Sequence, residues 1–167
     1  MIFMAVMIAV LVILDQWTKA AISSSMVLGQ SFEVISGFFN ITHVRNAGAA
    51  FGMGSGADDS IRFVLFKIIP VFACFWLAFL AWSERKGNIN LCTAYSLILA
   101  GAIGNLIDRF RLDYVVDFLD FHIKGSHFPA FNVADSAISI GAALYILDYL
   151  ISLRKQKKDP YNQASST

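Results

Sequence analysis

The stretch GAIGNLIDRFRLDYVVDFLDFHIKGSHFPAFNVADS, residues 101–136, decides the fold expected for this chain. It starts inside one long apolar segment and ends inside another. Between the two lie closely spaced polar groups: Asn105, Asp108, Arg109, Asp117, Asn132 and Asp135. A lipid-embedded chain keeps carboxylates at such places only where another group satisfies them or a reaction uses them. The stretch therefore predicts two membrane helices with a functional site between them.

The composition of the whole chain is that of a membrane protein. Of its 167 residues, 57% are hydrophobic and only 15% are charged, against about 25% in soluble domains. Four apolar segments approach the roughly 20 residues that a spanning helix needs: about 2–22, 61–82, 89–107 and 131–153. The first lacks a basic leader and a clear cleavage site, so we expect it to be retained. We expect one membrane-embedded domain over residues 1–167, mainly α, with four transmembrane helices.

Basic residues predict the orientation of these spans. The run RKQKK at 154–158 and the pair Arg85 and Lys86 are placed in the cytoplasm by the positive-inside rule. An even number of spans then puts both termini there, with the connections 23–60 and 108–130 outside. The basic run is too short, and too close to an apolar segment, to indicate nucleic acid.

The two outer connections have the composition of short strands. FEVISGFFNITHVRN at 32–46 and LDYVVDFLDFHI at 112–123 are rich in aromatic and β-branched residues. We expect them to form a small extracytoplasmic β-sheet that caps the bundle. Asp59 or Ser60 is the expected N-cap of the second helix.

Four carboxylates reach one level of the membrane from separate segments. Asp15 lies about 20 Å along the first helix at 1.5 Å per residue, near its outer end. Asp108 is expected to end the third helix on the same side, and Asp135 lies in the first turn of the fourth. Asp117 lies in the connection between them. The sequence therefore predicts a carboxylate cluster at the outer surface.

Asp117 and Asp135 have the chemistry of a catalytic pair. Two carboxylates held close cannot both ionise readily, so they share a proton; one can activate water while the other protonates a substrate carbonyl. A structural alternative remains for Asp135, because Asn132 could cap the fourth helix with Asp135 in its first turn. Asp117 lies in the apolar run VVDF, where a purely structural Asp is less expected.

The remaining polar groups suit supporting roles. Asp108, at a helix C-terminus, needs a cation such as Arg109 or Lys19, and Arg109 could also bind a substrate carbonyl or a lipid phosphate. Asn105 could orient either group. Asp15 and Lys19, four residues apart, favour a salt bridge. Lys19 and Ser23 could instead form a Ser–Lys nucleophile, but this requires a buried neutral lysine, and the following SSS run makes Lys19 look exposed.

The run RNAGAAFG at 45–52 offers small residues for close approach of a backbone. Asn46 could hydrogen-bond an extended peptide, and Gly48 leaves room beside it. Gly and Ala also serve as plain helix-packing residues, so the run alone does not decide between the two readings.

Five motifs together resemble lipoprotein signal peptidase, also called signal peptidase II, a bacterial aspartic protease family. They are DQWTK (15–19), RNAGAAFG (45–52), GAIGNLIDR (101–109), VVDF (115–118) and FNVADS (131–136), in the family's order. The family's catalytic dyad falls on Asp117 and Asp135. Its supporting and substrate-lining positions fall on Asp15, Asn46, Gly48, Asn105, Asp108, Arg109, Asn132 and Ala134, and the salt-bridge spacing adds Lys19.

The resemblance also implies a substrate and a location. The substrate is a prolipoprotein whose lipobox cysteine carries a diacylglyceryl group, and the cut falls just before that cysteine. Such enzymes use no metal or organic cofactor, and peptide antibiotics of the globomycin type block them. The expected partners are diacylated prolipoproteins and membrane lipid. We expect a monomer in the bacterial cytoplasmic (inner) membrane, with its active site at the outer leaflet.

Two other functions fit parts of the pattern. A metal-dependent phospholipid transferase also places carboxylates at a membrane interface, but usually repeats them along its helices. A proton or ion carrier could use Asp15, Asp108 and Asp135 as a relay. A relay needs ionisable groups throughout the bilayer, and the middle of each predicted span has none.

Overall fold

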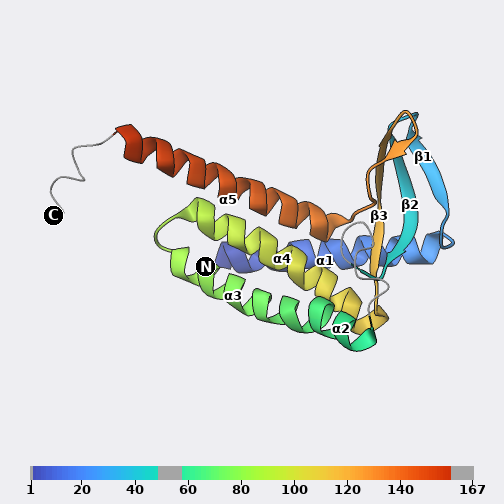
Figure 1. Ribbon diagram of the computed structural model, residues 1–167, viewed down its shortest axis with the longest axis horizontal. Helices are drawn as coiled ribbons and strands as arrows, with labels where there is room; N and C mark the ends of the chain where they lie inside the picture. Colours follow the sequence, from blue (N-terminus) through green and yellow to red (C-terminus); the bar gives the residue numbers. More distant parts are fainter. Residues whose placement is uncertain (1, 49–57, 159–167) are drawn as a thin grey trace.

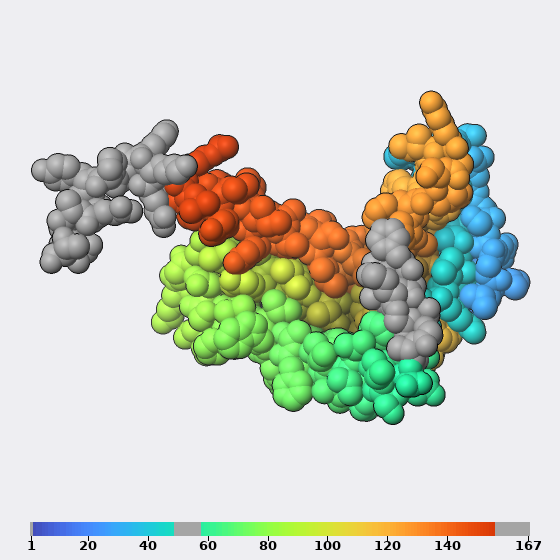
Figure 2. All heavy atoms as spheres, in the orientation of Figure 1, coloured from blue at the N-terminus to red at the C-terminus, as the bar shows by residue number. Residues whose placement is uncertain are grey.

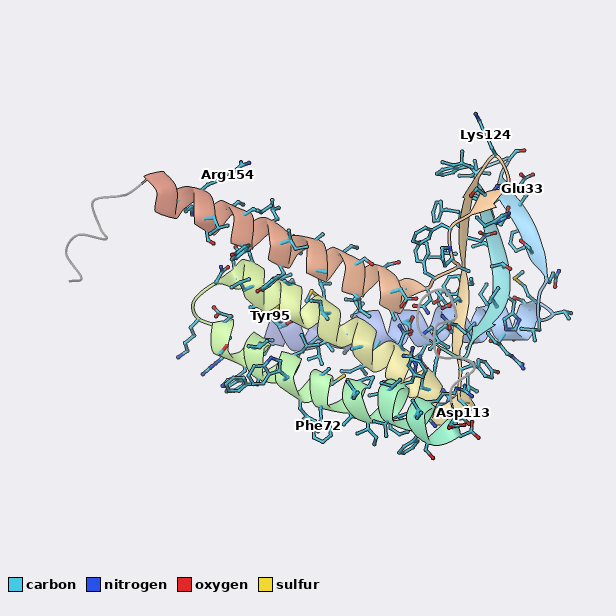
Figure 3. All side chains as sticks on the ribbon, in the orientation of Figure 1. Glu33, Phe72, Tyr95, Asp113, Lys124 and Arg154 are labelled. Atoms are coloured by element: carbon cyan, nitrogen blue, oxygen red, sulfur yellow. The ribbon has the colours of Figure 1, made fainter. Side chains whose placement is uncertain are left out.

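The computed structural model describes residues 2–48 and 58–158, and its four long helices confirm the predicted spans. They are α1 (Ile2–Ser25), a continuous rod of α2 (Asp59–Phe63), η2 (Val64–Ile68) and α3 (Ile69–Glu84), α4 (Ile89–Leu112), and α5 (Val133–Lys158). By length and composition each can cross a membrane. Large apolar side chains such as Phe72 and Trp76 are exposed on α3, as expected of a surface that faces lipid (Figure 3).

Helix α4 is the centre of the bundle, in contact with α1, α3 and α5 (Figure 1). Small residues allow close approach to α5: a Cβ atom at Gly101 would collide with the carbonyl oxygen of Ala134, and one at Gly141 would lie 2.7 Å from the carbonyl oxygen of Ala94. Contacts of this kind hold membrane helices together where no hydrophobic effect acts between them. The site residues of α4 and α5 are therefore fixed relative to each other.

The predicted cap is a four-stranded antiparallel sheet at one end of the bundle (Figure 1). Its strands are β1 (Ser31–Ile35), β2 (Phe39–Asn46), β3 (Val115–Ile123) and β4 (Ser126–His127), in that order. The pairs Phe39–Phe121, Ile41–Leu119 and Val44–Asp117 are in register, so these side chains share a face of the sheet. The face that carries Asp117 is therefore apolar beyond it.

Several predicted boundaries were wrong. The stretch 32–46, predicted only to have the composition of short strands, holds two of them, with an unpredicted turn at Gly37, where φ is +69°. The second helix is capped at Asp58, whose side chain makes no capping hydrogen bond, and both Asp59 and Ser60 lie inside the helix. The third span runs to Leu112 and ends where Asp113 turns left-handed, with φ of 64°. Asp108 is consequently one turn inside the helix rather than at its end.

Candidate active site

Asp117 and Asp135 line one cavity at the base of the sheet. The cavity measures about 490 Å³. Asp117, on β3, is only 2% exposed, and Asp135 lies in the first turn of α5. The other polar groups on its wall are Asn46, Asn105, Arg109, Ser136 and Ser139; the rest is mainly apolar, from Val115, Phe128, Pro129, Ala130, Phe131, Ile138 and Ile140. Figure 2 shows the molecule hollowed between the sheet and α5.

Amide side chains connect the two carboxylates. Asn132 Nδ2 donates to Asp117 Oδ1 at 2.7 Å, and Asn105 Nδ2 donates to Asp135 Oδ1 at 2.7 Å. Asn132 Nδ2 also donates to Asn105 Oδ1 at 3.2 Å, so the two amides touch. Asn46 Nδ2 donates to Asp117 Oδ2 at 3.0 Å. Neutral donors thus fix the positions of both carboxyl groups without supplying a positive charge.

Asn132 caps α5, with Asp135 in its first turn, as the structural alternative for Asp135 predicted. The backbone N–H of Asp135 donates to Asn132 Oδ1 at 2.9 Å, and the backbone N–H of Asn132 donates to Asp135 Oδ2 at 3.3 Å. This reciprocal pair has the pattern of a capping box, with Asp in the place of Glu. Asp135 therefore holds the end of its helix with one oxygen and lines the cavity as well. The two roles are compatible.

The environment of Asp117 favours the protonated acid. Burial raises the pKa of its carboxyl from the ordinary 3.8 to about 6, and the negative charge of Asp135 adds to the rise. The amides of Asn46 and Asn132 and the ammonium of Lys19 oppose it. A carboxyl with such a pKa can hold or release a proton near neutral pH, as general acid–base chemistry requires.

Lys19 is the centre of a separate buried cluster. Its ammonium lies 2.9 Å from Asp15 Oδ2, 2.9 Å from Asp108 Oδ2 and 2.9 Å from Asn105 Oδ1. The lysine is 3% exposed, so the expectation from the SSS run was wrong. The predicted Asp15–Lys19 salt bridge is confirmed, and Lys19 rather than Arg109 is the cation that pairs with Asp108. Asp15, Asp108 and Asn105 take up the three N–H donors of the ammonium, which argues against a Ser–Lys nucleophile.

The same cluster ties two helices to the catalytic candidates. Asp15 Oδ1 accepts from the backbone N–H of Ala134 at 2.9 Å, next to Asp135, and Asp108 Oδ2 accepts from that of Val116 at 3.3 Å, next to Asp117. Gly104 makes room for Asp15, because a Cβ atom there would lie 2.6 Å from Asp15 Oδ2. Each carboxylate of the cluster thus positions one carboxylate of the cavity.

Sequence reasoning missed Gln16. Its Nε2 donates to Asp15 Oδ2 at 3.2 Å, to the carbonyl oxygen of Gly104 at 3.1 Å and to Asp108 Oδ1 at 2.9 Å. A glutamine beside an aspartate in an otherwise apolar helix was the signal that could have found it. Gln16 completes the hydrogen bonds of the two buried carboxylates.

Asn46, Gly48 and Arg109 meet on the other side of the cavity. The backbone N–H of Gly48 donates to Asn46 Oδ1 at 3.1 Å, and Arg109 Nη2 donates to the carbonyl oxygen of Gly48 at 3.4 Å. All eleven residues singled out in the sequence therefore lie in or around one cavity. The remainder of the RNAGAAFG motif, from residue 49, lies outside the described residues.

Within residues 2–48 and 58–158, no group of three or more His, Cys, Asp or Glu side chains is arranged to hold a metal ion. Asp15 and Asp108 are occupied by Lys19 and Gln16. Asp117 and Asp135, which line the cavity, are not members of these ion pairs.

The fold and the site define the class of the protein, a multi-pass membrane enzyme. Two solved structures described as bacterial membrane enzymes superpose on it. One has a TM-score of 0.80 and 40% sequence identity and covers 96% of this chain and 90% of its own. The other has a TM-score of 0.78 and 41% identity and covers 89% and 92%.

The chain belongs to the signal peptidase II family, a family of aspartic peptidases, as the sequence motifs predicted. The family model for signal peptidase (SPase) II matches residues 7–151. A lipoprotein signal peptidase of Oleidesulfovibrio alaskensis is 49% identical over 142 residues, 84% of this chain and 90% of that protein. One of Geobacter sulfurreducens is 46% identical over 155 residues, 93% of this chain and 95% of that protein.

Proposed function

We propose that this protein removes the signal peptide from diacylglyceryl-modified prolipoproteins, with Asp117 and Asp135 as its catalytic dyad. The observation that carries the proposal is the placement of both carboxyl groups on one cavity, each held by a neutral amide. An aspartic peptidase needs two carboxyl groups that share one proton beside a bound peptide. The raised pKa of Asp117 is consistent with such a shared proton.

The reaction follows from that proton count. The ionised carboxylate takes a proton from water while the water oxygen attacks the carbonyl carbon of the scissile peptide. The protonated carboxyl gives its proton to the carbonyl oxygen, and a neutral tetrahedral diol forms. The first carboxyl then protonates the amide nitrogen and the second recovers its proton from a hydroxyl group. The C–N bond breaks, leaving a carboxyl on the signal peptide and a free amine on the lipidated cysteine.

The shape and polarity of the cavity suit a lipidated peptide. Its polar wall lies at the carboxylates, and its apolar wall is built from α5 and the segment 128–131. Phe131 stacks on Phe121, with ring centroids 5.8 Å apart, and extends the apolar wall onto the sheet. We assign the acyl chains to the apolar side and the scissile bond to the polar end. Peptide antibiotics of the globomycin type would occupy the same cavity.

The distribution of charge supports an active site at the outer leaflet of the bacterial inner membrane. Arg154 lies toward the end of α5 that is far from the sheet, and the connection that holds Arg85 lies at the same end of the bundle (Figure 3). The positive-inside rule places that end in the cytoplasm. The cavity and the sheet then face outward, where translocated substrates emerge.

The proposal is tested by direct cleavage. Purified protein is incubated with a diacylated prolipoprotein and with the same chain lacking the lipid, and the products are sequenced by mass spectrometry. We expect one new N-terminus at the lipidated cysteine, no cut in the unlipidated chain, and full activity in excess chelator. Loss of activity on metal removal would favour the phospholipid-transferase class instead, and ion flux through liposomes without cleavage would favour a carrier.

Asp148→Asn is the matched control for Asp135→Asn. Both aspartates lie on α5, and Asp148 accepts hydrogen bonds from Asn88 and Asn90 at the other end of the helix. We expect Asp135→Asn to abolish cleavage. Asp148→Asn should leave it within about twofold, since it alters only two hydrogen bonds at the far end of the helix. Near-normal turnover by Asp135→Asn would rule out the dyad.

A further inference from the structure

Arg62, on α2, has no place in the reaction described above, yet its guanidinium reaches the chain that leads to the cavity. Arg62 Nη2 donates to the carbonyl oxygen of Ala47 at 3.0 Å. Its ion pair with Asp59 is longer, at 3.6 Å, and Asp59 is fully exposed, whereas the Arg62 side chain is only 26% exposed. Exposed ion pairs contribute little. The bond to Ala47 is therefore the contact that orders this arginine.

A second arginine holds the next carbonyl group. Arg109, on α4, donates to the carbonyl oxygen of Gly48 at 3.4 Å. Both guanidinium groups line a separate cavity of about 400 Å³, together with Ala47, Phe63 and Phe66. Two successive carbonyl groups of the loop after β2 are thus held by arginines from two different membrane helices. Residues 47–48 are thus tied by charge-assisted hydrogen bonds to α2 and α4.

The loop held in this way positions Asn46. The backbone N–H of Gly48 donates to Asn46 Oδ1 at 3.1 Å, which directs the amide nitrogen toward Asp117 Oδ2 at 3.0 Å. A displacement of residues 47–48 would therefore turn the Asn46 amide away from Asp117. We propose that Arg62 is a positioning residue for catalysis, which keeps Asn46 aimed at Asp117 by holding the carbonyl oxygen of Ala47.

The helical turn that follows Arg62 contacts the end of α4. Within the rod, α2 continues directly into η2, a π-helical turn over Val64–Ile68. Within it, Lys67 Nζ donates to Asp113 Oδ1 at 2.6 Å, just past the end of α4, and Figure 3 shows Asp113 beside the start of the α2 rod. Single π-helical turns within α-helices are frequent at functional sites. Contacts between η2 and α4 keep the turn after Arg62 beside α4, which also bears Arg109 and Asn105.

The test compares Arg62→Met with Arg85→Met in a cleavage assay. Arg85 also donates to a backbone carbonyl oxygen, that of Trp82 at 2.6 Å, but at the other end of the same rod. We expect Arg62→Met to lower kcat about five- to tenfold with KM little changed, the effect of one displaced hydrogen bond to a reacting group. Arg85→Met should stay within about twofold.

A double mutant separates positioning from general stability. If Arg62 acts through Asn46, Arg62→Met should add nothing to Asn46→Ala, whereas independent effects would multiply. Multiplied effects, or a lower melting temperature with unchanged kcat, would overturn the proposal.

The pH–rate profile gives a second readout. Asp117 is faced by Asp135 on α5, Lys19 on α1 and Arg109 on α4, and Arg62→Met leaves all three charges in place. Losing the Asn46 donor disfavours ionised Asp117, so the limb set by this group should move to higher pH. A pH–rate profile whose Asp117 limb does not move in Arg62→Met would contradict the positioning role of Arg62. The inference rests on the proposed dyad, but an active Arg62→Met beside an inactive Asp117→Asn would refute only the inference.

Discussion

Two pairs of aspartates lie side by side in this protein and differ in what surrounds them. Asp15 and Asp108 share the ammonium of Lys19, at 2.9 Å from each. Asp117 and Asp135 receive amide donors from Asn132, Asn46 and Asn105, and within the described residues neither is in an ion pair. The carboxylates of the first pair are engaged in ion pairs, whereas those of the second pair receive hydrogen bonds from neutral amides. One pair therefore holds the structure, and the other is suited to chemistry.

The largest expected effect separates activity from stability. Asp117→Asn should lower the cleavage rate at least about a thousandfold, the loss typical of a missing general acid–base group. The folded protein should lose no more than about 1–3 kcal/mol of unfolding free energy, because the new amide has one acceptor oxygen for the two donors that Asp117 receives from Asn46 and Asn132. Cleavage assays and thermal unfolding in detergent measure both. A larger loss of stability would erase the contrast between the two pairs, because breaking a buried ion pair costs about 3–5 kcal/mol.

The reverse pattern is expected at the other pair. Lys19→Met leaves Asp15 and Asp108 buried without their cation, and breaking a buried pair of this kind costs about 3–5 kcal/mol of unfolding free energy. We expect a large fall in melting temperature and loss of activity as a consequence. Lys19→Arg, which keeps the charge, is the matched variant. An unchanged melting temperature with lost activity would move Lys19 into the chemistry itself.

The pH dependence of stability follows from the environment of Asp117. Its folded pKa of about 6 lies above the ordinary 3.8, so the folded state binds the proton more tightly than the unfolded state. Stability due to this group is full below about pH 4 and is lost as pH rises through about 6, by about 3 kcal/mol in all. Asp117→Asn should lack this fall. An identical pH profile in both proteins would contradict the raised pKa.

The pH dependence of the rate tests the shared proton. A dyad that needs one ionised and one protonated carboxyl gives a rate that passes through a maximum. The alkaline limb should lie well above the ordinary carboxyl value of about 4, because burial and mutual repulsion both oppose the second ionisation. A rate that rises steadily from about pH 5 to about pH 10 would favour a lysine or metal-hydroxide mechanism.

The smallest effect is expected at Ser136. It lines the cavity, but its hydroxyl donates back to the carbonyl oxygen of Asn132 at 2.9 Å, within its own helix. Ser136→Ala should change the cleavage rate by no more than about twofold, since this local bond can be replaced by water. A serine-reactive probe that labelled Ser136, or a large loss in the alanine variant, would shift the chemistry away from the aspartates.

Much of this arrangement could be predicted from the sequence because it depends on distance along the chain. Hydropathy predicted the four spans, and the rise per residue placed Asp15 at the same level as Asp135. Strand composition predicted the strands within 32–46 and 112–123, but neither the turn at Gly37 nor the short strand β4. The family motifs then pointed to the eleven residues that the structure brings to one cavity.

The sequence by itself determined the four spans, most of the sheet and the level at which the carboxylates meet, because each follows from local composition and helix length. Only the tertiary structure decided which carboxylate receives which partner. Lys19 looked exposed beside its serines, yet Asp108, contributed by α4, gives it a buried partner. The contacts of Gln16 and Arg62 also join residues far apart in the chain. Packing between helices sets these partners, and no sequence pattern within a single helix predicts them.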